Sequence, residues 1–221
     1  MAAHGSLMER LAGRVAVVVG AAGGIGKALA ELLAAGEMAV VMADLHADAL
    51  SLAAKELEAG GADVLAVPTD VSDPNQVEEL AAAAVERFGA VQVLCNNAGI
   101  AGRFGRTRAG SSEHALLGLS EALARELTAA GSNVAVTVMM PAGVAKTDIM
   151  ASERNWLDRL GPLPDADNDP LPTMVRNGFT AAAVEAIKTK RYLVCDDLDL
   201  LAEWSSHHVS QGLGEAPKWP L

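Results

Sequence analysis

Three glycines, Gly20, Gly24 and Gly26, lie in the run VVVGAAGGIGKALA, between an apolar segment and a helix-forming one. Glycines at such a junction let the backbone turn tightly, so that its N–H groups can approach an anion at the start of a helix. The chemistry that this pattern predicts is diphosphate binding, with Ile25 in the same turn. A plain tight turn is the alternative interpretation. The spacing differs from G-x-G-x-x-G, because three residues separate the first two glycines.

A carboxylate follows the glycines at a distance of about twenty residues. Asp44 and then Leu45 come directly after a second apolar run. A carboxylate at the end of a strand can accept hydrogen bonds from the adenosine ribose hydroxyls, and it would repel a 2′-phosphate. The position therefore favours NAD over NADP as the cofactor. The alternative role for Asp44 is an N-cap of the helix that begins near His46.

The elements that must position these residues alternate along the chain. Short apolar runs with β-forming residues are separated by helix-forming segments, which is typical of a parallel sheet covered by helices. The order predicts an α/β fold, a Rossmann-like doubly wound parallel sheet with helices on both faces, in one domain over residues 1–221. The expected strands are 14–19, 38–43, 64–67, 91–95, 134–140 and 191–194, and the expected helices are 25–35, 46–59, 72–88, 112–129 and 180–188.

Two further motifs follow the later strands. Asp70 and Val71 come after the third strand, and NNAG, residues 96–99, comes after the fourth. Together with the glycine turn and Asp44, these motifs resemble the short-chain dehydrogenase/reductase family. The resemblance implies that Asp70 and Val71 meet the adenine ring. It also implies that the NNAG residues line the cofactor and stiffen the sheet, and the cofactor-binding residues assigned there are Asn96, Ala98 and Gly99.

The resemblance resumes downstream and covers most of residues 11–148. SSEHALLGLSEALAREL is similar to the active-site helix of the family, and VAVTVMMPAGVAKT is similar to the next strand and its Pro-Gly turn. This implies that Pro141 and Thr147 lie at the nicotinamide end of the cofactor. Two departures occur in the turn: Ala142 stands where glycine is usual, and Thr147 is one residue further from Pro141 than the pattern asks.

The catalytic residues of the family have no counterpart in this sequence. The family uses a Tyr, a Lys four residues later on the same helical face, and a Ser from the preceding strand. The alignment puts Ala109 at the tyrosine and Glu113 at the lysine. Between Gly99 and Ser112 the family would place a further helix and strand of about 30 residues. We therefore expect no catalytic residue and one strand fewer than in a full family member.

No other side chain is expected to replace the missing ones. The only tyrosine, Tyr192, lies on the last predicted strand and is expected to have a half-buried packing role. His114 is expected to be solvated at the start of its helix, and Ser111 and Ser112 are expected to act as N-caps. Since general acid catalysis contributes roughly 10²- to 10⁴-fold, we expect the chain to be inactive or nearly so.

Charge and composition exclude several classes of partner. The formal net charge of −11 argues against nucleic acid, whose binding requires clustered Lys and Arg. The only basic cluster is Arg103, Arg106 and Arg108, which is expected to be a solvated loop, with an anion site as the alternative. No apolar run reaches the ~18 residues of a membrane helix. Cys95 and Cys195 are expected to be reduced thiols of a cytoplasmic protein, and no metal site is expected.

Three functional hypotheses remain open. The first is an NAD-dependent oxidoreductase by descent, acting on CH–OH groups, whose catalytic segment is missing. The second is a non-catalytic NAD-binding or regulatory partner, and the third is a degenerate fold that binds nothing. Residues 149–180 resemble the substrate lid of the family and imply a small hydrophobic alcohol or ketone, or else form a plain cap on the core. Residues 205–221 are expected to form a tail. A homo-oligomer is expected less strongly than the resemblance implies, since one family dimer helix is missing.

Overall fold

The computed structural model of the chain describes residues 11–98, 109–140 and 179–195. These residues belong to two compact units, one containing residues 11–98 and the other containing 109–140 and 179–195. Each unit has a parallel sheet of its own.

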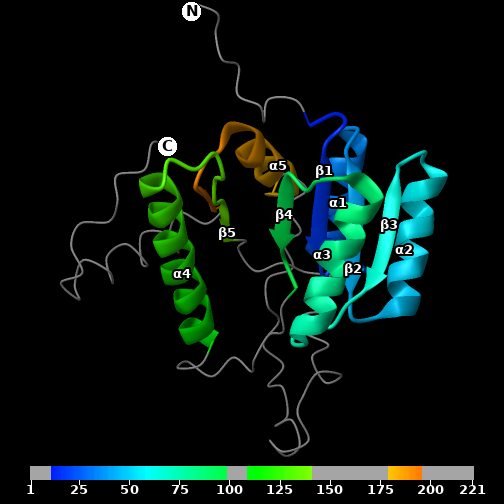
Figure 1. Ribbon diagram of the computed structural model, residues 1–221, viewed down its shortest axis with the longest axis horizontal. Coiled ribbons are helices and arrows are strands. Elements are labelled where there is room, and N and C mark those ends of the chain that lie inside the picture. Colours follow the sequence, from blue (N-terminus) through cyan, green and yellow to red (C-terminus); the bar gives the residue numbers. More distant parts are fainter. Residues whose placement is uncertain (1–10, 99–108, 141–178, 196–221) are drawn as a thin grey trace, which may run out of the picture. The chain divides into compact units, whose positions relative to one another are not determined.

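The first unit alternates strands and helices without exception. Its four strands are parallel and lie in the order β3-β2-β1-β4 (Figure 1). The chain therefore adds strands outward on one side of β1 and then returns to place β4 on the other side, as in doubly wound folds. The elements are β1 (Val15–Val19), α1 (Gly24–Ala35), β2 (Ala39–Asp44), α2 (Ala47–Ala59), β3 (Val64–Pro68), α3 (Pro74–Phe88) and β4 (Val93–Asn96).

The core of this unit lies on both faces of the sheet. All five residues of β1 are buried, as expected for a strand that is covered on each side. Val15, Val17 and Val19 pack with Leu80 and Ala84 of α3. Ala16 and Val18 point to the opposite face because side chains alternate along a strand.

Helices α1 and α2 contact β1, β2 and β3, and each contributes side chains with almost no exposed area, among them Leu29, Leu33 and Leu50. The expected Rossmann-like parallel sheet with helices on both faces is confirmed.

The helix ends follow local chemistry. Asp73 is the N-cap of α3, its carboxylate accepts the N–H of Asn75 at 2.9 Å, and Pro74 takes the first helical position. Gly36 follows the last residue of α1, as predicted, but the left-handed conformation is adopted by Glu37, with φ 61°. A left-handed residue with a Cβ is strained, which makes Glu37 an unfavourable choice at this position.

The second unit is smaller. It contains α4 (Ala109–Ala129), β5 (Val138–Met140), α5 (Phe179–Thr189) and β6 (Leu193–Cys195). Strands β5 and β6 are parallel, with Val138 opposite Leu193. Ala186 of α5 is fully buried and packs with Met139 of β5. A strand, a helix and a parallel strand thus form the core of this unit.

Helix α4 begins earlier than the sequence predicts. The expected start was Ser112, with Ser111 and Ser112 as capping residues, but the helix already begins at Ala109 and contains both serines in its first turns. A loop was expected over residues 99–111 because that stretch is rich in Gly and Arg and has no periodicity. A glycine inside a helix costs only about 1 kcal/mol, which the following helix-forming residues can offset.

All six described strands differ in bounds from those predicted, and three of them begin two or more residues later than expected. The expected strand 134–140 is reduced to Val138–Met140, because its partner β6 also has three residues and no ladder can extend beyond the shorter strand. The strand predicted at 191–194 begins at Leu193, so Tyr192 lies just before it. The strand predicted at 91–95 is Val93–Asn96, in register with residues 16–19 of β1.

Several expectations stay predictions. The lid at 149–180 lies almost wholly outside the described residues, as does the tail at 205–221. The single domain over residues 1–221 and the loss of one strand relative to a full family member also stay predictions. Among the helices of the described segments, none is long and apolar enough to cross a membrane.

Candidate functional site

The glycine turn is anchored to the neighbouring strand. Directly after β1, the N–H groups of Gly20 and Ala21 both donate to the carbonyl of Ala43 in β2, at 2.8 and 3.0 Å. Gly20 and Gly24 have φ of 75° and 54°, conformations that other residues rarely adopt. The turn therefore has a defined path from the end of β1 into α1.

Gly26 occupies a space in which no side chain fits. A Cβ at this position would lie 2.0 Å from the carbonyl oxygen of Gly20 and 2.6 Å from Nδ2 of Asn97. A Cβ on Gly20 would lie 2.9 Å from Cα of Ala98. The turn and the residues after β4 therefore approach so closely that only glycine is compatible with the backbone.

Asn97 holds this close approach together. Its side-chain amide donates to the carbonyls of Val19 and Gly20, at 3.3 and 3.2 Å. The sequence prediction assigned cofactor binding to Asn96, Ala98 and Gly99 and omitted Asn97. The sequence signal for Asn97 was a polar amide directly after β4. Because β4 lies next to β1 in the sheet, this amide faces the end of β1.

Helix α1 presents an uncapped N-terminus to the turn. Its N-cap residue, Gly23, makes no side-chain hydrogen bond, and the first helical turn holds no acidic residue. The first N–H groups of a helix have no partner within the helix and carry partial positive charge. In contrast to α3, which Asp73 caps, α1 leaves these donors available to an anion.

Asp44 connects the turn to the next helix. One carboxylate oxygen accepts the N–H of Ala22 at 3.1 Å, and the other accepts the N–H of His46 at 3.0 Å. His46, and not Asp44, is the N-cap residue of α2. Each carboxylate oxygen has a further lone pair, so both can still accept a hydrogen bond from a hydroxyl group of a ligand.

The loop after β3 lies beside Asp44. Thr69 is buried, and its N–H donates to the carbonyl of Asp44 at 2.9 Å. One oxygen of Asp70 accepts the hydroxyl and the N–H of Ser72, which holds the pKa of this carboxyl below its ordinary value. Leu45 and Val71 each expose 51% of their surface, so two apolar side chains are open to solvent at this edge.

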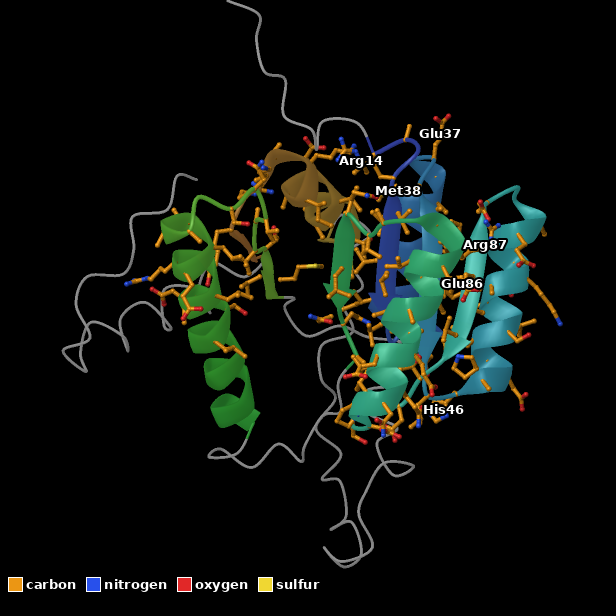
Figure 2. All side chains as sticks on the ribbon, in the orientation of Figure 1. Arg14, Glu37, Met38, His46, Glu86 and Arg87 are labelled. Atoms are coloured by element: carbon orange, nitrogen blue, oxygen red, sulfur yellow. The ribbon has the colours of Figure 1, made fainter. Side chains whose placement is uncertain are left out.

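The predicted nucleotide residues that the structure describes all come from the carboxyl ends of parallel strands. This edge of the sheet is where open α/β sheets bind ligands. Figure 2 shows His46 at this end and Glu37 with Met38 at the opposite one. Asn96 closes β4 opposite Val19. The residues placed along this edge are Gly20, Gly24, Ile25, Gly26, Asp44, Leu45, Asp70, Val71, Asn96 and Ala98. Gly99, Pro141 and Thr147 lie outside the described residues.

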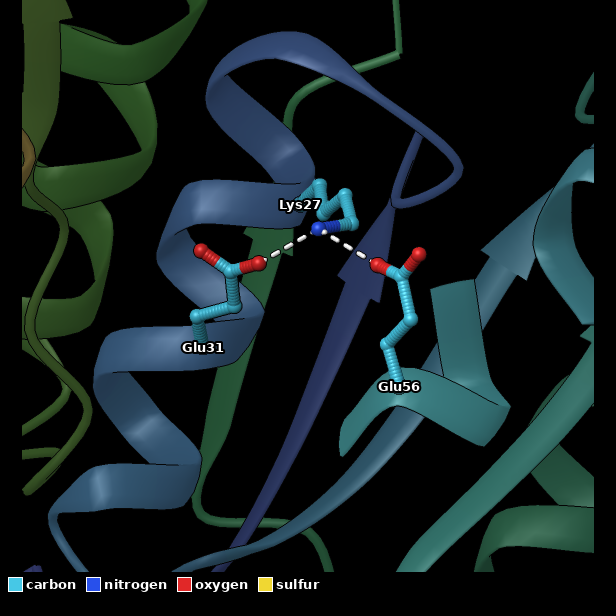
Figure 3. Close-up of polar contacts among 3 residues, drawn as sticks. All are labelled: Lys27, Glu31 and Glu56. Carbon is cyan, nitrogen blue, oxygen red and sulfur yellow. Dashed lines mark hydrogen bonds and ion pairs between the residues drawn. The ribbon is translucent and has the colours of Figure 1, made fainter. Parts of the chain in front are cut away.

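A cation next to the turn is already neutralised. Nζ of Lys27 lies 2.5 Å from Glu31 of α1 and 3.0 Å from Glu56 of α2 (Figure 3). The hydrogen bonds to Glu31 and Glu56 raise the pKa of Lys27 above its ordinary value. Lys27 therefore joins the two helices, and its charge is engaged by one carboxylate from each of them.

Other groups that could carry chemistry are metal-binding side chains, the thiol of Cys95 and the phenol of Tyr192. In the parts of the chain that the structure describes, no group of three His, Cys, Asp or Glu side chains could hold a metal ion. Burial raises the pKa of the Cys95 thiol to about 11, so it stays protonated near neutral pH. Burial, with the charge of Glu121, also raises the pKa of Tyr192, which is only partly exposed.

Comparison with protein families assigns the first unit. Residues 14–110 match the family model described as short chain dehydrogenase. Over these residues the chain resembles the short-chain dehydrogenase/reductase family, as its sequence motifs predict. The matched residues include the glycine turn, Asp44, the loop after β3 and Asn97.

The curated relatives are similar over the same region. A 1-deoxy-11-beta-hydroxypentalenate dehydrogenase from Streptomyces exfoliatus is 50% identical over 93 residues, which are 42% of this chain and 34% of the relative. An uncharacterized oxidoreductase from Thermotoga maritima is 43% identical over 90 residues, 41% of this chain and 35% of that protein. The match spans about a third of the length of these relatives.

Solved structures resemble a larger part of the chain. A short-chain dehydrogenase/reductase from Burkholderia phymatum in complex with NAD has a TM-score of 0.78 and 27% identity, covering 96% of this chain and 99% of that chain. A short-chain dehydrogenase from Novosphingobium aromaticivorans has a TM-score of 0.69 and 21% identity over 95% of this chain and 89% of its own. The second likeness concerns the fold alone.

Proposed function

We propose that the protein binds a nicotinamide dinucleotide at the carboxyl edge of the first unit, and that it prefers NAD to NADP. The observation that carries this proposal is the cradle at Gly26, where a Cβ would meet the carbonyl of Gly20 at 2.0 Å. A turn this close, beside a helix start without a cap, fits a diphosphate whose oxygens accept backbone N–H groups.

The preference for NAD rests on Asp44. Its two oxygens are oriented by the N–H groups of Ala22 and His46, so the carboxylate is held in place before any ligand arrives. A fixed carboxylate accepts hydrogen bonds from ribose hydroxyls and repels the additional charge of a 2′-phosphate. A solved relative of this family was determined in complex with NAD, which supports the same class of cofactor.

Calorimetric titration of NAD and NADP into the purified protein tests this proposal. We expect wild type to bind NAD at least about tenfold more tightly than NADP, a difference of about 1.4 kcal/mol. Asp44→Asn should weaken NAD binding and reduce the ratio of the dissociation constant for NADP to that for NAD. Asp63→Asn is the matched control, because Asp63 pairs with Arg87 at the start of β3 and should leave both affinities unchanged.

Two results would contradict the proposal. Absence of a titration signal and of any thermal stabilisation at millimolar NAD would overturn dinucleotide binding, because a ligand of the native state must raise its stability. Equal affinity for NAD and NADP in wild type would overturn the assigned role of Asp44 alone.

We further propose that the chain as given is an oxidoreductase by descent that transfers little or no hydride. The positions that correspond to the Tyr and Lys of the family hold Ala109 and Glu113 on α4. An anion at the second position would raise the pKa of a neighbouring acid and so oppose its ionisation. The substrate class by descent is a small hydrophobic alcohol or ketone.

The rate of hydride transfer can be measured directly from the absorbance of the NADH that forms. Wild type with NAD and a panel of hydrophobic secondary alcohols should give no rate above that of the buffer. If NAD binds and no alcohol is oxidised, the result favours a non-catalytic NAD-binding protein. A rate that depends on enzyme concentration would disprove inactivity.

A further inference from the structure

The loop between β3 and α3 is held by one side chain at both of its ends. Gln76 lies in the first turns of α3 and is partly buried. Its Oε1 accepts the N–H of Asp70 at 2.8 Å, and its Nε2 donates to a carboxylate oxygen of Asp73 at 3.1 Å. An amide is suited to this task, because it carries an acceptor and two donors on the same group.

The other hydrogen bonds of the loop do not replace those of Gln76. The N–H of Asp73 donates to the carbonyl of Asp70, and the carboxylate of Asp70 accepts from Ser72, so these bonds stay within the loop. Thr69 connects only the first residue of the loop to β2. Gln76 is the contact that joins Asp70 to helix α3.

The position of this loop gives the contact a functional meaning. Strand β3 pairs with β2 on the side away from β1, and Asp44 lies opposite Pro68 in the register. A diphosphate at the glycine turn and a ribose at Asp44 direct the base toward the next strand end, which is this loop. The exposed apolar side chains of Leu45 and Val71 provide surface that a planar base can cover.

We propose that Gln76 is a positioning residue for the base of the dinucleotide: it holds the backbone of Asp70 and Val71 in the orientation that receives the adenine ring. This inference rests on the proposed dinucleotide function. Gln76 acts through the loop and not by touching the reacting end of the cofactor. Preorganisation of this kind improves affinity because the loop does not have to be ordered at the moment of binding.

Calorimetric titration with AMP, NAD and inorganic pyrophosphate tests the proposal. Gln76→Ala should weaken the binding of AMP and of NAD by about five- to tenfold. This is the effect expected from the loss of about one hydrogen bond and a less ordered loop. Pyrophosphate, which lacks the base, should bind with unchanged affinity. A general loss of structure would instead weaken all three.

Gln92 supplies a matched control variant. Its Oε1 accepts the N–H of Val15 at 2.8 Å, so it makes the same kind of side-chain-to-backbone bond, next to the amino end of β1. Gln92→Ala should lower the free energy of unfolding without changing the affinity for AMP. Urea denaturation of both variants provides the comparison of stability.

The conservative variant Gln76→Glu adds a readout that a purely structural role would not move. At about pH 8 the introduced carboxylate is ionised. It then has no donor for Asp73, and the negative charges of Asp73 and Asp70 repel it. Protonation at about pH 5 restores a donor, so the affinity for AMP relative to wild type should recover as the pH falls.

The outcomes separate this inference from the function on which it rests. If wild type binds neither AMP nor NAD, the proposed function itself fails. If wild type binds AMP and Gln76→Ala binds it equally well, the role of Gln76 is overturned. The same holds if Gln92→Ala weakens AMP binding as much as Gln76→Ala does.

Discussion

Asn97 and the glycines of the turn act as one packed group. The amide of Asn97 fills the space that a side chain at Gly26 would need, and it donates to the carbonyls on both sides of the first turn residue. These contacts hold the turn in position in the absence of a ligand. Substitutions in this group should affect ligand binding and stability together.

Gly26→Ala is the sharpest test of this packing. The added methyl group would meet backbone atoms, which cannot rotate away, so the turn must shift. We expect a loss of about 1–3 kcal/mol in the free energy of unfolding and loss of detectable NAD binding. Urea denaturation and calorimetric titration measure the two effects.

The same chemical change at Gly118 serves as the control. Gly118 lies inside α4, and apart from its chain neighbours and the nearby backbone of its own helix, no atom of the described residues lies within 4 Å of the position of its Cβ. Gly118→Ala should stabilise the protein by up to about 1 kcal/mol, because alanine favours a helix more than glycine does. If both variants were destabilised equally, the crowding at Gly26 would not be the cause of its effect.

Glu37 stores backbone strain at the end of α1. It adopts a φ of 61°, and its N–H donates to Ala34 while its carbonyl accepts the N–H of Gly13. Glu37→Gly removes the strained Cβ and keeps both backbone bonds, so we expect stabilisation of about 1 kcal/mol. A lower urea midpoint in this variant would contradict the strain argument.

At the level of elements, Lys27 ties α1 to α2. Its ammonium lies between carboxylates of both helices, as Figure 3 shows, and its side chain is 28% exposed. Ion pairs with this degree of exposure contribute modestly, and salt screens them.

Lys27→Met should therefore lower the free energy of unfolding by about 0.5–1 kcal/mol at low salt. The folded-state pKa of Lys27 is raised above 10.5. The contribution is thus fully present below the unfolded pKa and is lost as the pH rises through the folded one. Denaturation at increasing pH should show the two proteins converging only above about pH 10.5. Lys188→Met, which breaks a more exposed pair with Glu185 at 3.6 Å, should have no measurable effect.

The existence and type of every described element could be predicted from the sequence, and several bounds could not. Continuous apolar runs such as Val15–Val19 and the capping pair Asp73 and Pro74 are local signals, so they survive without knowledge of the fold. The shortening of β5 could not be predicted, because its length is set by a partner strand about fifty residues away in sequence. The ion pair by which Lys27 connects the two helices could not be predicted either, since Glu56 is distant along the chain.

On the scale of the whole chain, the two units predict separate responses to ligand. The predicted nucleotide residues described by the structure all belong to the first unit, whereas α4 and α5 belong to the second. Saturating NAD should therefore slow amide hydrogen exchange at residues 20–26, 44–46 and 69–73. Locally opening amides of α5 should exchange at an unchanged rate. Protection spread evenly over both units would contradict this division.

The site itself was predictable in part. Asp44 was identified from its distance to the glycines, but its bonds to Ala22 and His46 depend on how the turn folds back onto β2. Asn97 was recognised as part of the NNAG motif but was not assigned to the cofactor site. Gln76 was missed, because an amide that binds backbone groups leaves no periodic or charge pattern in a sequence. The nicotinamide end, with Gly99, Pro141 and Thr147, stays a prediction.

The strand order also implies a sequence of events during synthesis. Strands β1, β2 and β3 are contiguous in the chain and can pair as soon as residue 68 is available, with closure of only short segments. The amide of Asn97, by contrast, reaches the carbonyl of Val19 across 78 positions. The glycine turn is translated early, but it acquires its contacts with Asn97 only after β4 has been synthesised.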